Sequence, residues 1–248
     1  MSDALNGRIA VITGAEQPLG RGLTLALGRA GARIALLGEA QQLAPTVAEL
    51  EGAQVRTVGI EVDWSSREAA EDAFEEVADA LGPVDILLHA SVPDVAFEPL
   101  DFADVDDERF EAIWERILRT TIFVLQAAFP QMQGRGGRVL FVTPTVSMSG
   151  AARLTPYTAA VEAQRVLLKA TARQWGPEGI TLNSLAPAPD HLPIGMASTE
   201  VSLAPPALGG PGDPEHDLGP IAVFLASDAG HFVTGATIGA DGGIWMAP

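Results

Sequence analysis

The sequence predicts a doubly wound α/β fold, in which a mainly parallel seven-stranded sheet carries helices on both faces. Short apolar, β-branched runs alternate with longer amphipathic stretches along the whole chain, as in βαβ units with parallel strands. The apolar runs contain few polar residues, which is typical of strands buried on both faces. A length of 248 residues with 47% hydrophobic content suits one core. We therefore expect a single domain over residues 1–248.

The first half of the chain predicts four strands and three helices. The expected strands cover 7–14, 32–38, 54–63 and 83–90, and the expected helices cover 19–31, a stretch starting near Pro45, and 66–82. Gly31 is a normal stop for the first helix. Ser65 or Ser66 can cap the third helix, whose acidic first half suits the positive end of the helix dipole.

The second half predicts three further strands. Long amphipathic helices are expected over about 107–131 and 155–176, with strands at 137–143 and 180–186, a helix at 216–228, and a last strand and turn at 234–243. The segment 187–214 is rich in proline and glycine and has no sustained period. We expect it to be a flexible, lid-like loop.

Composition excludes several classes of function. The chain has 32 acidic and 15 basic residues, a formal net charge of −17, which repels phosphate backbones and anionic lipid headgroups. We therefore expect no nucleic-acid partner and no membrane partner. No run of about 18 apolar residues occurs and the start resembles no leader peptide, so a cytoplasmic location is expected. The four histidines lie far apart and the chain has no cysteine, so we expect no metal site and no disulfide.

Six motifs, in order, resemble the short-chain dehydrogenase/reductase family. They are TGAEQPLG at 13–20, DWS at 63–65, GPVDILL at 82–88, the helix opened by the only tyrosine, Tyr157, ITLNSLAP at 180–187, and FLASD at 224–228 with DGG at 241–243. The resemblance covers essentially the whole chain. It implies a Rossmann-like fold, a nicotinamide cofactor, and dimers or tetramers that pack through the two long helices.

The resemblance implies cofactor contacts in the turn after the first strand. Gly14 and Gly20 match the family's glycines, which let the backbone approach a diphosphate. Pro18 stands where the family has its middle glycine, so one N–H donor is lost. Proline is also common at a helix start, which gives Pro18 a purely structural interpretation.

Three further positions align with cofactor-binding residues. Glu39 follows the second strand, where a carboxylate holds a ribose 2′-hydroxyl and repels a 2′-phosphate, and this favours NAD(H) over NADP(H). Asp63 matches the residue that contacts the adenine amino group. His89 replaces the family's asparagine at the end of the fourth strand. Glu39 can equally be a solvated residue before a helix, and His89 a structural histidine.

The catalytic set that the resemblance implies is reduced to Tyr157. The family's lysine, four residues later, is Val161 here; its serine is Pro144, and its asparagine aligns with Ile117. Enoyl reductases place a lysine seven residues after the tyrosine, where this chain has Gln164. Without a cation nearby, a tyrosine keeps a pKa of about 10 and is a poor base at neutral pH. These replacements predict a degenerate site with no cofactor bound, or NAD(H) if any.

Three functions remain open. The first is a catalytically impaired or non-catalytic subunit that forms a homo-oligomer, or a hetero-oligomer with an active homologue. The second is an NAD(H)-dependent dehydrogenase or ketoreductase acting on a hydroxyl or carbonyl group, with Tyr157 assisted by Thr145 or His89. The third is a non-redox enzyme that uses the cofactor cleft for a small apolar substrate, with Tyr157 as a neutral hydrogen-bond donor.

Overall fold

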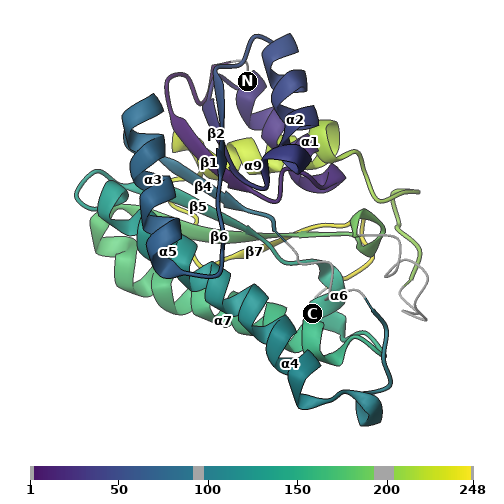
Figure 1. The fold of residues 1–248 in the computed structure, drawn as a ribbon. Coiled ribbons are helices and arrows are strands. Elements are labelled where there is room, and N and C mark those ends of the chain that lie inside the picture. The colour runs from purple at the N-terminus through teal and green to yellow at the C-terminus, as the bar shows by residue number, and fades with distance from the viewer. Residues whose placement is uncertain (1–2, 92–97, 193–203, 247–248) are drawn as a thin grey trace.

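The structure, a computed structural model, describes residues 3–91, 98–192 and 204–246. Over these residues, seven parallel strands form one sheet in the order β3-β2-β1-β4-β5-β6-β7 (Figure 1). The strands are β1 (Ile9–Thr13), β2 (Arg33–Gly38), β3 (Thr57–Glu61), β4 (Ile86–His89), β5 (Gly137–Val142), β6 (Ile180–Pro187) and β7 (Thr237–Ala240). The predicted fold class is confirmed.

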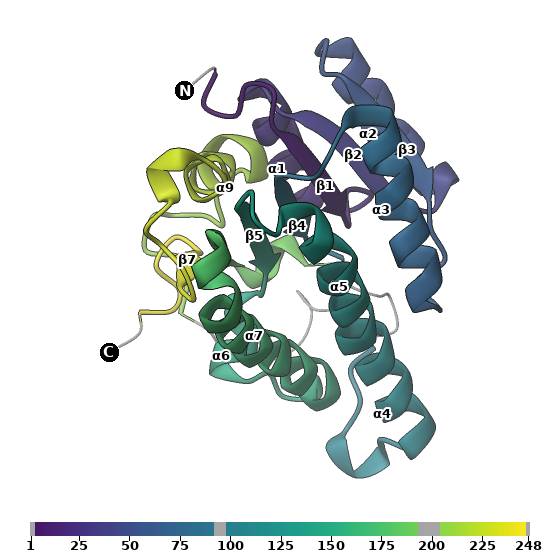
Figure 2. The ribbon, with the colours of Figure 1, turned by 90° about the vertical axis from the view of Figure 1, so that its left-hand side faces the viewer.

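Helices cover both faces of the sheet. They are α1 (Pro18–Arg29), α2 (Ala40–Gly52), α3 (Arg67–Leu81), α4 (Asp107–Trp114), α5 (Thr120–Met132), α6 (Thr145–Ser149), α7 (Thr155–Trp175) and α9 (Gly219–Ala226). Among the described residues, α1, α2 and α9 pack on one face, and α3, α5 and α7 pack on the other (Figures 1 and 2). The five central strands are buried on both faces because their apolar residues are nearly continuous, whereas the edge strands β3 and β7 are partly exposed.

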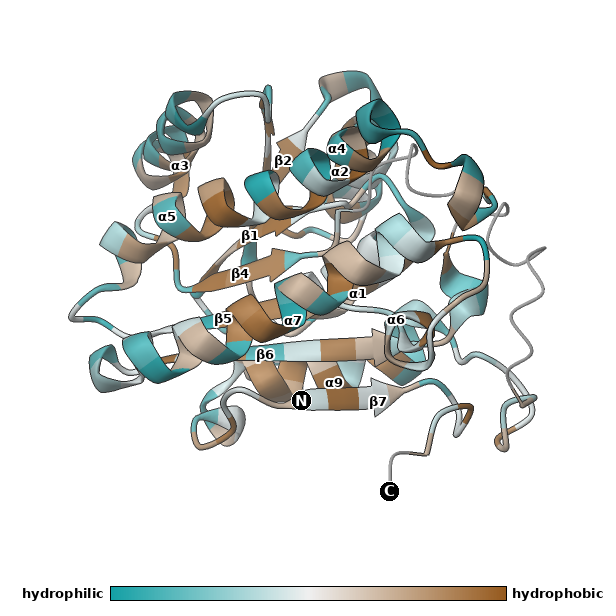
Figure 3. Ribbon diagram, turned by 90° about the horizontal axis from the view of Figure 1, so that it is seen from below, coloured by the Kyte–Doolittle hydropathy of each residue, from teal (hydrophilic) through white to brown (hydrophobic). Residues whose placement is uncertain are grey.

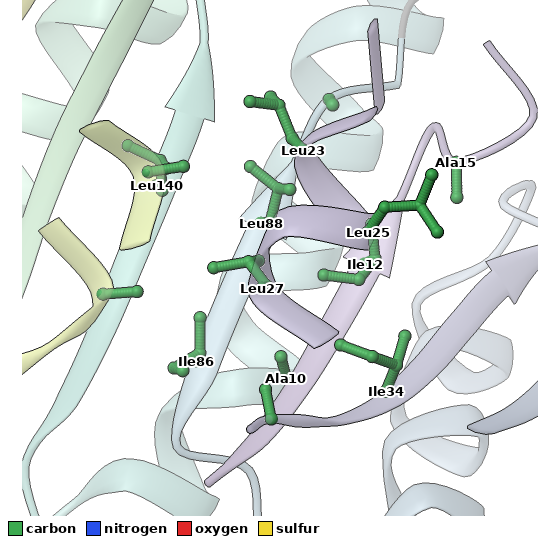
Figure 4. Packing of buried hydrophobic residues seen from close by; sticks show 14 of the residues in the cluster. Ala10, Ile12, Ala15, Leu23, Leu25, Leu27, Ile34, Ile86, Leu88 and Leu140 are labelled. Atoms are coloured by element: carbon green, nitrogen blue, oxygen red, sulfur yellow. The ribbon is translucent and has the colours of Figure 1, made fainter. Parts of the chain in front are cut away.

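The first strand shows how one apolar run serves two cores. Ala10 and Ile12 face α1, where they meet Leu23 and Leu27, while Val11 faces the opposite layer (Figure 4). This follows from the two-residue period of a strand, which points successive side chains to opposite faces. Figure 3 shows the same pattern, with apolar strands between helices whose colouring is mixed.

Helix starts match the expected capping chemistry in two of three cases. Pro18 is the first residue of α1, and Ser66 caps α3 by accepting a hydrogen bond from Ala69 N at 3.1 Å. The third prediction, a helix starting near Pro45, is wrong because α2 begins at Ala40 and carries Pro45 inside it. Burial of Leu43 and the hydrogen bond from Thr46 Oγ1 to Ala15 O at 2.8 Å outweigh the roughly 3 kcal/mol cost of an interior proline.

The helix expected over 107–131 is interrupted. A π-helical turn, Glu115–Arg119, separates α4 from α5, and the two helices continue along nearly one line (Figures 1 and 2). The short helix α6, directly after β5, was not predicted and occupies what the sequence suggested was a loop. Both features bear on the site, because α6 and the π-turn each pack against α7.

The expected lid, 187–214, is only partly described. Pro189–His191 forms a 3₁₀ turn after β6, and His191 Nε2 lies 3.0 Å from the carbonyl oxygen of Pro211. Residues 193–203 lie outside the described part of the chain, so the prediction of a lid is untested. In the described residues, no helix combines the length and apolar character needed to cross a membrane.

Candidate active site

A cleft of about 640 Å³ opens at the carboxyl ends of the central strands. This volume lies within the range of about 300–1,000 Å³ typical of small-molecule sites. Its lining includes Gly14 after β1, Glu39 after β2, Asp63 after β3 and Ser91 after β4. Ligands bind in this place in open α/β sheets, where the strand order reverses about β1.

The turn after β1 requires its glycines for close packing. Gly14 has φ +83°, and a Cβ added there would lie 2.4 Å from the carbonyl carbon of Ala90. A Cβ on Gly20 would lie 2.0 Å from Gly14 O. Pro18 follows Gln17, the N-cap, whose side chain makes no capping bond. The first turn of α1 therefore approaches the cleft closely but presents one N–H fewer than a helix without proline.

Two acidic side chains occupy the expected adenosine end of the cleft. Glu39 Oε2 accepts a hydrogen bond from Gln42 Nε2 at 2.5 Å. Asp63 accepts from the Ser65 hydroxyl at 2.7 Å and from Ser65 N at 3.0 Å, and these bonds, the hydroxyl's first, lower the pKa of the Asp63 carboxyl. Both groups line the cleft. Carboxylates here can accept hydrogen bonds from ribose hydroxyls and an adenine amino group, so these residues fit a dinucleotide.

His89 lies in the interior. Its Nδ1 is 2.7 Å from Thr13 Oγ1 and its Nε2 is 3.1 Å from Thr121 Oγ1. Burial lowers the pKa of His89 to about 4, so the ring is neutral at neutral pH. It is not among the cleft-lining residues that the structure describes. Its contacts suit the structural interpretation, in which it joins β1, β4 and α5.

Tyr157 is fully buried in an apolar cluster. Its neighbours there include Ile117, Val161, Leu154 and Leu192. Burial raises the pKa of the Tyr157 phenol above its usual value, so the hydroxyl is protonated at neutral pH. The structure thus brings Tyr157 together with two of its expected partners, Ile117 and Val161. Tyr157 shares this cluster with Ile117, a residue of the π-turn whose Glu115, Arg116 and Arg119 line the cleft.

Pro144 and Thr145, the other two residues expected near Tyr157, take part in local structure at α6. Pro144 is the N-cap of α6. The Thr145 hydroxyl lies 3.0 Å from both Asp241 Oδ2 and Pro187 O. Asp241 also accepts from three backbone N–H groups of the C-terminal turn, so Thr145 helps to anchor that turn.

Sequence reasoning missed the cations of the site and their neighbour on α5. Arg116, Arg119 and Thr120 all line the cleft from the π-turn and the start of α5. One available signal was the pair of arginines three residues apart in a strongly acidic chain. The turn that directs them to the cleft could not be recognised from residue types alone.

The fold and this cleft together define a doubly wound α/β protein with a ligand-sized cleft at the carboxyl ends of its strands. A family model described as enoyl-(acyl carrier protein) reductase matches residues 14–245. A short-chain dehydrogenase/reductase of Armillaria gallica is 31% identical, with 96% of each chain covered. An L-rhamnose 1-dehydrogenase (NAD(P)+) of a Sphingomonas species is 30% identical, with 98% of each chain covered.

The solved structures agree with these relatives. A blue fluorescent protein from a metagenomic library, solved in complex with NADPH, has a TM-score of 0.84 and 28% identity, covering 98% of this chain and 100% of the other. The chain belongs to the short-chain dehydrogenase/reductase family.

One prediction about the cofactor is wrong. The sequence led us to expect that no cofactor binds, because Pro18 and Val161 replace family residues. The solved neighbour holds NADPH, and the Sphingomonas relative is named for NAD(P)+. The prediction rested only on the loss of one N–H at Pro18 and of one cation at Val161. The cleft, its two acidic groups and the closely packed glycine turn are all present.

Proposed function

We propose that the chain is an NAD(H)-dependent oxidoreductase that reduces a carbonyl group, with Tyr157 as the proton donor. The observation that carries this proposal is that Tyr157 shares an apolar cluster with Ile117 of the π-turn, and this turn lines the cleft that also bears Glu39 and Asp63. The names of the relatives support a dinucleotide-dependent reaction. Glu39 supports NAD(H) because its carboxylate repels a 2′-phosphate.

The protonation state of Tyr157 supports the direction of reaction. A phenol whose pKa is raised by burial holds its proton at neutral pH. It is therefore in the form that can donate a proton to the alkoxide oxygen created by hydride addition, and while protonated it cannot remove a proton from an alcohol. The reduced cofactor supplies the hydride when bound. Hydride to carbon and proton to oxygen together give the alcohol.

The surroundings of Tyr157 favour a small, apolar substrate. The phenol is enclosed by Ile117, Val161 and Leu192, which offer no charged side chain. Apolar walls strengthen a hydrogen bond from the phenol to a developing oxyanion, because the local dielectric is low. We infer that the substrate carries its carbonyl group next to an apolar group.

A non-catalytic subunit is the competing interpretation. It rests on Val161, Pro144 and Ile117 at positions where the resemblance implies a lysine, a serine and an asparagine. The matched relatives carry the names of working dehydrogenases, which favours an enzyme. Assembly into homo-oligomers is compatible with either interpretation, and we propose it here through α4, α5 and α7.

Replacement of Tyr157 by phenylalanine tests the proposal. Loss of a general acid lowers rates by about 10²–10⁴-fold, so Tyr157→Phe should slow the NADH-dependent reduction of small ketones by that factor. NADH affinity, measured by calorimetry, should stay unchanged because Tyr157 is not among the described residues that line the cleft. NADH oxidation that is as fast in the variant as in the wild type would contradict the assignment.

A further inference from the structure

The charge of the cleft is uneven. Its lining carries the acidic side chains of Glu16, Glu39, Asp63 and Glu115. Among the described lining residues, the cations are Arg116 and Arg119, both on the π-turn. A ligand with phosphate groups therefore meets repulsion over most of this cleft. Attraction is confined to the wall formed by the turn.

The π-turn determines which way these arginines face. A π-turn closes i→i+5 bonds and so inserts one extra residue into the helix. One residue corresponds to about 100° of rotation in an α-helix. With the insertion, Arg116 and Arg119 line the cleft while Ile117 and Thr121 are buried. The extra residue rotates α4 relative to α5 by about this angle, and Arg116 and Arg119 lie within the turn itself.

A buried polar cluster holds the turn in place. Thr121 Oγ1 lies 2.7 Å from the carbonyl oxygen of Ile117, 2.6 Å from Gln164 Nε2 and 3.1 Å from His89 Nε2. The Thr121 hydroxyl has one proton. It donates this proton to the Ile117 carbonyl oxygen, because a carbonyl can only accept a hydrogen bond. It therefore accepts from both Gln164 and His89.

This arrangement assigns the tautomer of His89. The ring carries its proton on Nε2, facing Thr121, and its Nδ1 accepts from the Thr13 hydroxyl at 2.7 Å. The cluster joins four elements: Thr13 lies on β1, His89 on β4, Thr121 on α5 and Gln164 on α7. All four side chains are at most 5% exposed. The turn is thus fixed by four elements and not by its own sequence.

We propose that Arg116 and Arg119 bind the diphosphate of the dinucleotide, an inference that rests on the proposed function. The glycine turn, which would otherwise supply backbone donors, has lost one N–H at Pro18. Arg119 is paired with Glu115 at 2.5 Å, and both side chains are more than half exposed. A guanidinium has five N–H donors, so Arg119 can keep this pair and still reach a phosphate.

The diphosphate is favoured over a 2′-phosphate as the group bound. Glu39 stands at the end of β2 and lines the cleft, in the place where a 2′-phosphate would have to sit. Its charge opposes that group. The arginines and Gly14 of the glycine turn line this same cleft.

Calorimetric titration with adenosine, adenosine diphosphate, NADH and NADPH tests the assignment. The variants are Arg116→Ala, Arg119→Ala and the double variant. Arg67→Ala is the matched control, because Arg67 forms a similar exposed i,i+4 pair with Glu71 on α3 but does not line the cleft. Circular dichroism and the melting temperature of each variant verify that it is folded.

We expect the double variant to bind adenosine diphosphate and NADH about tenfold or more weakly, as for the loss of charge-assisted bonds to phosphate. Adenosine affinity should be unchanged, and Arg67→Ala should behave as the wild type. The wild-type preference for adenosine diphosphate over adenosine should shrink as salt is raised.

Three outcomes overturn the proposal, and they are distinguishable. Unchanged NADH affinity in the double variant would refute the arginine assignment and leave the proposed function intact. A loss confined to NADPH would show that the arginines meet a 2′-phosphate. Failure of the wild type to bind any of the four probes would refute both the assignment and the proposed function.

Discussion

Tyr157 and His89 are both buried, and burial shifts their pKa values in opposite directions: it raises that of Tyr157 and lowers that of His89. Each keeps its neutral form, because a low dielectric penalises the charged state. For Tyr157 the neutral form is the one that carries the proton needed in reduction. For His89 the neutral form is the one that completes the hydrogen bonds to Thr13 and Thr121. Protonation of His89 would place a second N–H against the Thr13 hydroxyl and a charge in the core.

The stability of the fold should therefore depend on His89 in mild acid. Its pKa is lowered from 6.5 to about 4 in the folded chain, so the unfolded chain binds a proton first as pH falls. The stabilisation is complete above pH 6.5 and is lost as pH falls towards 4. By linkage this amounts to about 3 kcal/mol. Urea unfolding at a series of pH values measures it.

The control for this prediction is a pair of histidine variants. His89→Asn removes the titrating group but retains hydrogen-bonding capacity, so the fall between pH 6.5 and 4 should diminish by about 3 kcal/mol. His231→Asn changes an exposed histidine and should leave the fall as it is. An identical pH dependence in His89→Asn and the wild type would show that the ring does not titrate as described.

At the scale of elements, Pro18 has two opposing effects on the start of α1. Pro18 preorganises the first turn but removes an N–H that could face a diphosphate. Pro18→Gly should tighten NADH binding about tenfold, as for one added hydrogen bond to a charged group. It should also lower the free energy of unfolding by about 1 kcal/mol, because glycine gains entropy in the unfolded chain.

Pro45 offers a comparison within the same layer of helices. Pro45→Ala lies inside α2, so it should raise stability by restoring an N–H and leave NADH affinity unchanged. If Pro18→Gly binds NADH no better than the wild type, the backbone of the first turn does not contact the cofactor. Calorimetry and thermal unfolding of both variants provide the comparison.

The elements also show what sequence reasoning could reach. Strands and most helices were predictable, because apolar runs, Ser66 and the glycine turn act locally. The start of α2 was not, since burial of Leu43 and Thr46 outweighs the signal from Pro45. The π-turn could not be predicted either, because side chains of four other elements, β1, β4, α5 and α7, hold it in place. Arg116 and Arg119 belong to that turn, so their position at the cleft could not be predicted from the sequence.

For the whole molecule, surface composition bears on assembly. Exposed apolar side chains lie along α4, α5 and α7: Phe110, Trp114, Ile122 and Val166. Phe110 and Trp114 stack with ring centroids 5.7 Å apart. A chain with a formal net charge of −17 repels its own copies, and salt screens that repulsion. We expect a homo-oligomer whose dissociation constant falls as sodium chloride is raised from about 0.01 to 0.5 M.

Light scattering coupled to size exclusion measures this assembly. Trp114→Glu, which puts a charge on the apolar face, should shift the chain towards the monomer, while Phe232→Glu, an exposed position after α9, should not. A monomer at every salt concentration would contradict the expected assembly through α4, α5 and α7.

The central claim is that the cleft at the carboxyl edge binds NAD(H), and calorimetric titration of the wild-type chain with NADH and NADPH tests it most directly. The account predicts submillimolar NADH binding that is tighter than NADPH binding, because Glu39 opposes a 2′-phosphate. It also predicts that Glu39→Gln narrows this difference. Absence of NADH binding at millimolar concentration, or a preference for NADPH, would contradict the account.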